Sequence, residues 1–151
     1  MPNKHTFSDH MASVQVILYH KHPTSAMTRF FKLADGGVSI GSPLPELSRV
    51  VTGEEVNEPS IVALPGAIAA EIEQWLGLEV GTVVADTEYQ ELVEVPGDIL
   101  RVYLMRFKTI DPPFREAEIA GASFIALTQA RGLIPSELEL LRKAYVMIME
   151  G

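Results

Sequence analysis

The spacing of hydrophobic residues in the first fifty positions predicts extended strands. Residues 13–20 (SVQVILYH) are β-branched and aromatic, which is the composition of a strand. Residues 28–33 (TRFFKL) favour a second strand, and the turn signal Asp-Gly-Gly at 35–37 would let residues 38–40 pair back. The run 46–51 fits either a helical turn or a strand.

Two helices are marked by residues at their ends. Pro65 suits a first helical turn, where its missing N–H loses no partner, and Gly77 suits the left-handed position that ends a helix. Ser136 and Glu139 have the spacing of a capping box, which predicts the start of the last helix. Between Pro65 and Gly77, four large apolar residues share one helical face: Ile68, Ile72, Trp75 and Leu76.

The segment between these helices predicts a β-hairpin. Residues 82–95 and 99–110 are both strand-like, and the turn signal Pro-Gly-Asp separates them. Residues 120–127 (AGASFIAL) follow as a short apolar strand. This order of strands and helices predicts an α+β or α/β sandwich in one domain.

Length and composition agree with one domain. The chain has 151 residues, 47% of them hydrophobic and 21% charged, and no cysteine, which excludes disulfides and thiolate chemistry. Residues 1–12 are polar and mixed in charge, so we expect a flexible segment there and place the domain at residues 13–151. No hydrophobic run reaches the ~20 residues of a membrane span, so we expect a cytoplasmic protein without a membrane partner.

Negative charge is concentrated in the middle third of the chain. The net charge is −8, and from Glu46 to Asp98 there are twelve acidic residues and one basic residue, Arg49. Nucleic-acid binding depends on lysine and arginine, so we expect no nucleic-acid partner. Clustered carboxylates can hold a divalent cation, meet a basic partner or form a solvated face, and the solvated face is the interpretation that charge alone favours.

From residue 69 onward the sequence resembles the Nudix superfamily. The family motif is a glycine loop and then a helix reading Arg-Glu-apolar-any-Glu-Glu-any-Gly-apolar, and residues 70–78 read AEIEQWLGL. Residues 123–145 (SFIALTQARGLIPSELELLRKAY) look like the closing strand, turn and helix of the family. The resemblance covers roughly residues 53–151 and implies a single-domain, Nudix-like α/β/α sandwich with a mixed sheet. In that family, helix carboxylates hold Mg²⁺ against a pyrophosphate.

The helix matches only part of that carboxylate set. Glu71 occupies a motif position and is the one catalytic candidate, but the positions on its face hold Gln74 and Trp75. Ala70 stands where the motif has arginine, and Glu58 is a counterpart of the glycine-loop glutamate at too long a spacing. One carboxylate with an amide is a poor magnesium site, because affinity comes largely from ligand charge.

These observations favour a Nudix-like domain without the usual magnesium set, acting as a binding or regulatory module for a nucleotide-like small molecule, with no cofactor expected. The alternative is a Mg-dependent pyrophosphohydrolase of a nucleoside diphosphate derivative with a rearranged metal site. The second alternative is an α+β protein-interaction domain, such as a homodimer built through the hairpin edge. The rearranged metal site would combine Glu71 with Glu54, Glu55 or Glu58, joined by Glu88 or Glu91.

The hairpin also carries the candidate ligand contacts. Arg101 and Arg106 can bind a ligand phosphate, although pairing with glutamates across the hairpin is the favoured interpretation. Tyr103, like Tyr89, can stack on a base, with packing in the fold as the simpler role. The glutamates available for such pairing are Glu88, Glu91 and Glu94.

Histidines offer one further set of metal ligands. His20 and His22 are two residues apart, so both side chains can point the same way from a strand, with His5 and His10 upstream. No third ligand is placed by the sequence, and we favour an ordinary surface strand end.

Overall fold

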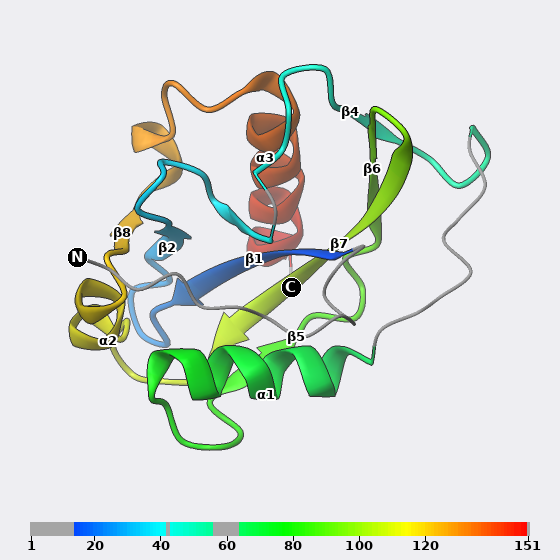
Figure 1. Cartoon of the computed structure of the whole chain (residues 1–151). Coiled ribbons are helices and arrows are strands. Elements are labelled where there is room, and N and C mark those ends of the chain that lie inside the picture. The colour runs from blue at the N-terminus through cyan, green and yellow to red at the C-terminus, as the bar shows by residue number, and fades with distance from the viewer. Residues whose placement is uncertain (1–13, 42, 56–63, 151) are drawn as a thin grey trace.

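An eight-stranded mixed sheet forms the centre of the computed structural model, which describes residues 14–41, 43–55 and 64–150 (Figure 1). The strands in chain order are β1 (Val14–Lys21), β2 (Thr28–Lys32), β3 (Ser39–Ile40), β4 (Arg49–Val51), β5 (Val83–Ala85), β6 (Glu91–Val95), β7 (Asp98–Phe107) and β8 (Ser123–Ile125). The helical elements are α1 (Pro65–Leu76), α2 (Phe114–Ile119), the 3-10 turn η2 (Leu127–Gln129) and α3 (Pro135–Glu150). Within these ranges, no helix is both long enough and apolar enough to cross a membrane.

The sheet is organised around a central parallel pair of strands. Its order is β4-β6-β7-β1-β2-β8, with β3 also pairing with β1 and β5 with β7. β1 and β7 run parallel, with Tyr19 beside Arg106, and the remaining pairs are antiparallel. The carboxyl ends of β1 and β7 therefore meet at one edge of the parallel pair.

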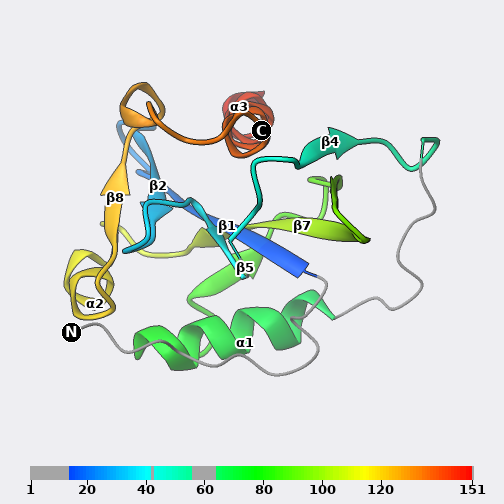
Figure 2. The same ribbon diagram turned by 45° about the horizontal axis from the view of Figure 1, so that its top comes forward.

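Helices cover both faces of the sheet, which confirms the predicted α/β/α sandwich. α1 lies along one face and α3 on the other, and two views agree on this arrangement (Figures 1 and 2). Side chains alternate along a strand, so Val16 and Leu18 of β1 pack with the α1 core while Ile17 and Tyr19 pack with the α3 core. This alternation decides which functional side chains of β1 and β7 can meet.

The helix predicted between Pro65 and Gly77 is confirmed. Pro65 stands in the first turn, and Gly77 ends the helix with φ 70° while its N–H donates to the Gln74 carbonyl at 3.3 Å. Three of the four residues of the predicted apolar face are buried, and Trp75 is half-buried with its ring edge-on to Phe31 at 5.9 Å. The buried three are Ile68, Ile72 and Leu76.

The hairpin turn at residues 96–98 is confirmed, but its first strand is shorter than predicted. Residues 82–95 form two strands, β5 and β6, which pair with different parts of β7. They are separated by a turn in which the Asp86 N–H donates to the Leu104 carbonyl and the Tyr89 N–H donates to the Asp86 carbonyl. The run 46–51, which fitted either a helical turn or a strand, starts as a turn at residues 46–47 and ends as the strand β4.

Two features near the end of the chain differ from prediction. The capping box is wrong, because α3 begins at Pro135 and Ser136 lies within its first turn, where the hydroxyl hydrogen-bonds to that of Ser48. The six-residue helix α2 was not predicted; it follows Pro112-Pro113, and its Ala117 joins the α1-side core.

Candidate functional site

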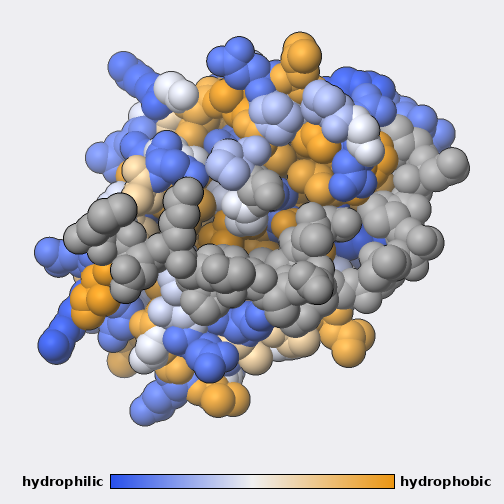
Figure 3. All heavy atoms as spheres, in the orientation of Figure 1, coloured by the Kyte–Doolittle hydropathy of each residue, from blue (hydrophilic) through white to orange (hydrophobic). Residues whose placement is uncertain are grey.

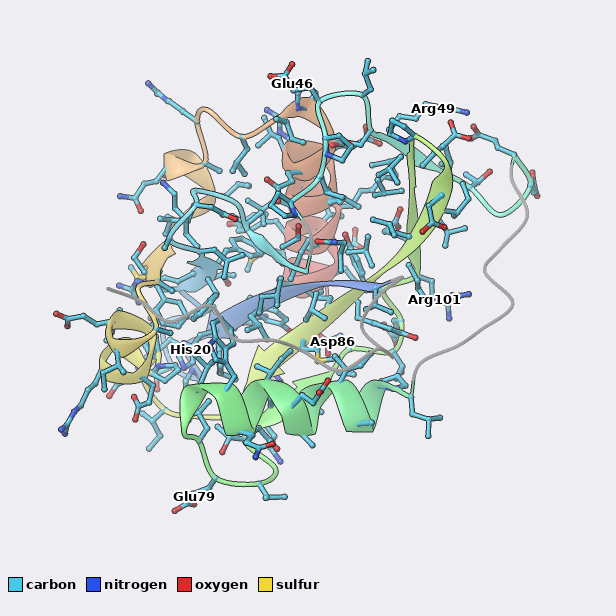
Figure 4. The ribbon with its side chains drawn as sticks, viewed as in Figure 1. His20, Glu46, Arg49, Glu79, Asp86 and Arg101 are labelled. Carbon is cyan, nitrogen blue, oxygen red and sulfur yellow. The ribbon has the colours of Figure 1, made fainter. Side chains whose placement is uncertain are left out.

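A cleft of about 210 Å³ opens where α1 begins, and we call it the Arg101 cleft. It is bounded by the first helical turn of α1, by the turn after β5 and by β7, on which Arg101 lies (Figure 4). Its wall combines a cation, aromatic rings, a hydroxyl and an amide: Pro65, Ala85, Thr87, Tyr89, Gln90, Arg101, Val102 and Tyr103. This composition suits a small ligand with both charged and aromatic parts.

Arg101 and Tyr103 reach this cleft together because they are two residues apart on one strand. Both are half-buried, and Tyr103 packs against the α1-side core with Met105 and Phe107, which have the same parity. Arg106 has the opposite parity and lies in a different cleft with Tyr19. The structure therefore brings together Arg101 and Tyr103 and places Arg106 on the other face of the sheet.

Tyr89 belongs to the framework of the cleft. Its side chain is 4% exposed, and its hydroxyl donates a hydrogen bond of 2.9 Å to the Leu140 carbonyl. Burial, followed by the charges of Glu91 and Glu139, raises the pKa of Tyr89 above its ordinary value. The phenol therefore stays a neutral donor that anchors the cleft wall to α3, in line with the packing role expected for it.

The first turn of α1 contributes partial positive charge at the edge of the Arg101 cleft. Leu64 at the N-cap makes no side-chain cap hydrogen bond, and no acidic residue occupies the first turn. Backbone N–H groups at a helix start carry partial positive charge, which favours an anion nearby. The helix and Arg101 thus act in the same direction on a negatively charged ligand.

Glu71 and the residues near it on α1 differ in burial and in the groups that they contact. Glu71 is half-buried, Gln74 is exposed, and Trp75 packs against Phe31 as expected. Glu73 is the most buried carboxylate of this helix, with 4% exposure, and its Oε2 accepts a 2.9 Å hydrogen bond from the Val83 N–H.

The role of Glu73 was not foreseen, although the sequence carried a signal for it. Ala69, Ile72, Glu73 and Leu76 follow the i, i+3, i+4, i+7 spacing of a buried stripe, and all four are buried. A carboxylate in such a stripe needs a hydrogen-bond donor, and β5 supplies it through a backbone N–H. Glu73 therefore joins α1 to β5, whose last residue, Ala85, lines the Arg101 cleft.

The carboxylates proposed as further metal ligands lie elsewhere or outside the described residues. Glu55 follows β4, where Arg49 binds it at 3.0 Å and also binds Glu94 at 2.9 Å. These hydrogen bonds, Glu94 first, raise the pKa of Arg49. β4 and α1 lie on opposite sides of the molecule in both ribbon views (Figures 1 and 2), so Glu55 is not brought to Glu71. Glu58 is outside the described residues.

Within the described ranges, no group of three or more histidine, aspartate or glutamate side chains is arranged to hold a metal ion. Two of the hairpin glutamates instead pair with cations from other elements: Glu94 with Arg49, and Glu91 with Lys143 at 3.9 Å. Glu91 lies opposite Val102 in the sheet register, on the α3 face rather than the face of Arg101. Burial raises the pKa of Glu91, an effect that Lys143 opposes and Glu139 reinforces.

His20 and His22 do not form the surface pair that the sequence suggested. His20 is fully buried in β1, with Nε2 at 2.7 Å from the Thr109 carbonyl oxygen. His22 Nδ1 accepts from the N–H groups of Thr24 and Ser25, and the two rings are 6.5 Å apart between centroids. His5 and His10 lie outside the described residues.

Comparison of the sequence with models of known protein families gives no match, and comparison with curated proteins gives none either. The class that the fold defines is an α/β sandwich with a mixed sheet.

Proposed function

We propose that this protein is a Nudix-like ligand-binding or regulatory domain that holds a nucleotide-like anion in the Arg101 cleft. The observation that carries the proposal is the shared position of Arg101 and Tyr103, two residues apart on β7, beside the first turn of α1. A guanidinium can bind a phosphate through two parallel hydrogen bonds. A tyrosine ring offers a flat face on which a base can stack.

The polar residues of the cleft complete this assignment. Thr87 and Gln90 from the turn after β5 supply a hydroxyl and an amide beside the two β7 residues. Such groups can bond the edge of a base or the hydroxyls of a sugar. The phosphate then lies toward Arg101 and the start of α1, and the ring lies toward Tyr103.

The same proposal includes a Nudix-like scaffold that works without the family's magnesium ion. Two helices on opposite faces of a mixed sheet support this assignment, as does the resemblance of residues 70–78 and 123–145. The donors on α1 do not fit a magnesium centre: Glu71 shares its face with the amide of Gln74 and with Trp75, whose ring is packed on Phe31. We therefore assign the domain a binding role and derive no hydrolytic step.

Nucleotide binding by the purified protein tests the proposal. AMP, ADP and ADP-ribose should raise the melting temperature by about 5–10 °C at ~100 times Kd, because a ligand that binds only the folded state stabilises it. Arg101→Gln should weaken binding by about tenfold or more, since a hydrogen bond to a charged group contributes ~1.5–3 kcal/mol. Arg142→Gln, an exposed arginine on α3, is the matched control and should bind like the original protein.

Three results would overturn the proposal. The first is the absence of a saturable response to any of these nucleotides. The second is equal weakening by Arg101→Gln and Arg142→Gln. The third is magnesium-dependent release of nucleoside monophosphate that is lost in Glu71→Gln, which would establish the hydrolase alternative.

The protein-interaction alternative predicts a different result, a stable dimer in light scattering with no ligand response. Hydrophobic residues on the face shown in Figure 3 are interspersed with hydrophilic ones. The large exposed apolar side chains are spread over separate parts of the fold, including Leu47 before β4, Val80 after α1 and Ile119 on α2. This dispersion favours small-ligand binding over a single docking face.

A further inference from the structure

A second cleft, of about 180 Å³, lies on the α3 face of the sheet, and we call it the Tyr19 cleft. It forms where the parallel strands β1 and β7 end, with Tyr19 and Arg106 as register partners. The carboxyl ends of parallel strands are where open α/β sheets commonly bind ligands. Asp86, seen in Figure 4 apart from Arg101, reaches this cleft from the turn after β5.

Two carboxylates line the Tyr19 cleft, and one of them is held in position. Asp86 is half-buried, and its Oδ2 accepts a hydrogen bond from the Tyr19 hydroxyl. A carboxylate has about four acceptor positions, so this single bond orients the group and leaves it able to accept from a ligand. Glu88 adds a second carboxylate to the lining. Together the two carboxylates suit an ammonium group.

Two cations line the same cleft. Arg106 is exposed on β7, close enough to Tyr19 for its charge to act on the phenol. Lys21 of β1 extends to the end of α3, where its Nζ donates a 3.0 Å hydrogen bond to the Ile148 carbonyl. Lys21 is thereby fixed in the wall, and the Arg106 guanidinium, whose planar fork matches a carboxylate, is the group exposed for a ligand anion.

Two apolar side chains also line the cleft. Met147 and Ile148, from the last turns of α3, line the cleft, and Ile148 also belongs to the α3-side core. Methionine in particular adapts its shape to an aliphatic group beside it. A ligand that satisfies all three parts carries an ammonium, a carboxylate and a short aliphatic chain.

We propose that the Tyr19 cleft binds a free aliphatic α-amino acid, with its ammonium on Asp86 and Glu88, its carboxylate on Arg106 and its side chain over Met147. The two carboxylates would repel a ligand that carries only negative charge, and Arg106 and Lys21 would repel one that carries only positive charge. A ligand with both charges is therefore favoured. The Tyr19 cleft has no lining residue in common with the Arg101 cleft, and this proposal does not rest on the nucleotide proposal.

Calorimetric titration with leucine, methionine and norvaline tests this site, with pentylamine and pentanoate as ligands that lack one charge. We expect saturable binding of at least one amino acid and binding of the amine and the acid at least about tenfold weaker, since each lacks a charge-assisted contact. Arg106→Gln and Asp86→Asn should each weaken amino-acid binding by a similar factor. The matched controls are Arg142→Gln and Glu139→Gln, two exposed residues on α3, which should leave it unchanged.

The proposal is overturned if none of the three amino acids binds at millimolar concentration, or if pentylamine or pentanoate binds as well as they do. It is also overturned if Arg106→Gln and Asp86→Asn behave like their controls. Tyr19→Phe supplies a second line of evidence, because it removes the hydroxyl that orients Asp86 and keeps the charges; it should weaken binding less than Asp86→Asn. Nucleotide binding at the Arg101 cleft, measured on the same samples, distinguishes the two sites.

Discussion

Replacement of Glu137 by alanine should be among the most destabilising single changes in this fold. Glu137 lies in the first turn of α3 with 7% exposure. Its Oε2 accepts three hydrogen bonds, from the N–H groups of Val38 and Ser39 at 3.2 Å each and from the Ser39 hydroxyl at 2.9 Å. One carboxylate oxygen therefore joins the start of α3 to β3, almost a hundred residues earlier in the sequence.

The size of the effect follows from what the substitution leaves behind. Glu137→Ala removes the acceptor of two buried backbone N–H groups, and each unsatisfied buried group costs about 1–3 kcal/mol. The Ser39 hydroxyl can rotate toward another partner, so we assign it no cost. The free energy of unfolding should fall by about 2–6 kcal/mol, a large part of the ~5–15 kcal/mol typical of a domain.

Urea unfolding followed by circular dichroism measures this difference. The matched control is Glu139→Ala, which removes an exposed glutamate from the same helix and should change the free energy of unfolding by less than about 0.5 kcal/mol. Glu137→Gln keeps a carbonyl oxygen that can accept one of the bonds, so it should fall between the two. Equal midpoints for Glu137→Ala and Glu139→Ala would refute the argument that this carboxylate holds β3.

Three further changes test other parts of the structure. Glu73→Ala removes the acceptor of the Val83 N–H and should lower the free energy of unfolding in urea by about 1–3 kcal/mol. The control is Gln74→Ala, at an exposed position of the same helix, which should not lower this free energy. Gly77→Ala places a Cβ on a residue with φ 70° and should cost ~1–2 kcal/mol, seen in calorimetry as a lower melting temperature; an unchanged temperature would contradict the left-handed helix end. Glu91→Gln tests the raised pKa of Glu91, because burial disfavours the charged form of this carboxyl group. The free energy of unfolding of the wild type should fall relative to that of the variant as pH rises through the folded-state pKa of Glu91, and the two should not differ below the ordinary glutamate range. Unfolding measured below and above this pH interval gives the sign, and a relative gain in wild-type stability at the higher pH would refute burial as the cause.

Elements with strong local signals were predicted from the sequence. The helix from Pro65 to Gly77 is fixed by a residue that suits its first turn, a residue that suits its end and an apolar stripe between them. The turn at residues 96–98 is equally local. The order of strands across the sheet was not predictable in this way, because it depends on long-range pairs such as β1 with β7.

Tertiary partners overrode local signals where the prediction was wrong. Ser136 and Glu139 have the spacing of a capping box, yet the Ser136 hydroxyl bonds to Ser48 and Glu137 bonds to β3. The strand expected at residues 82–95 is interrupted by a turn in which the Tyr89 N–H donates to the Asp86 carbonyl. The partners of Ser136 and Glu137 are far away in the sequence, so no local pattern specifies them.

The three candidate ligand contacts Arg101, Arg106 and Tyr103 can be divided into two groups from the sequence alone. Alternate residues of a strand point to opposite faces, so the parity of these numbers alone separates Arg106 from the other two. Parity does not say what lies over each face, which depends on where α1 and α3 pack. With the helices in place, Arg101 and Arg106 line two clefts that have no lining residue in common, although the turn at residues 86–90 borders both. The effects of Arg101→Gln and Arg106→Gln should therefore be independent, each confined to its own ligand.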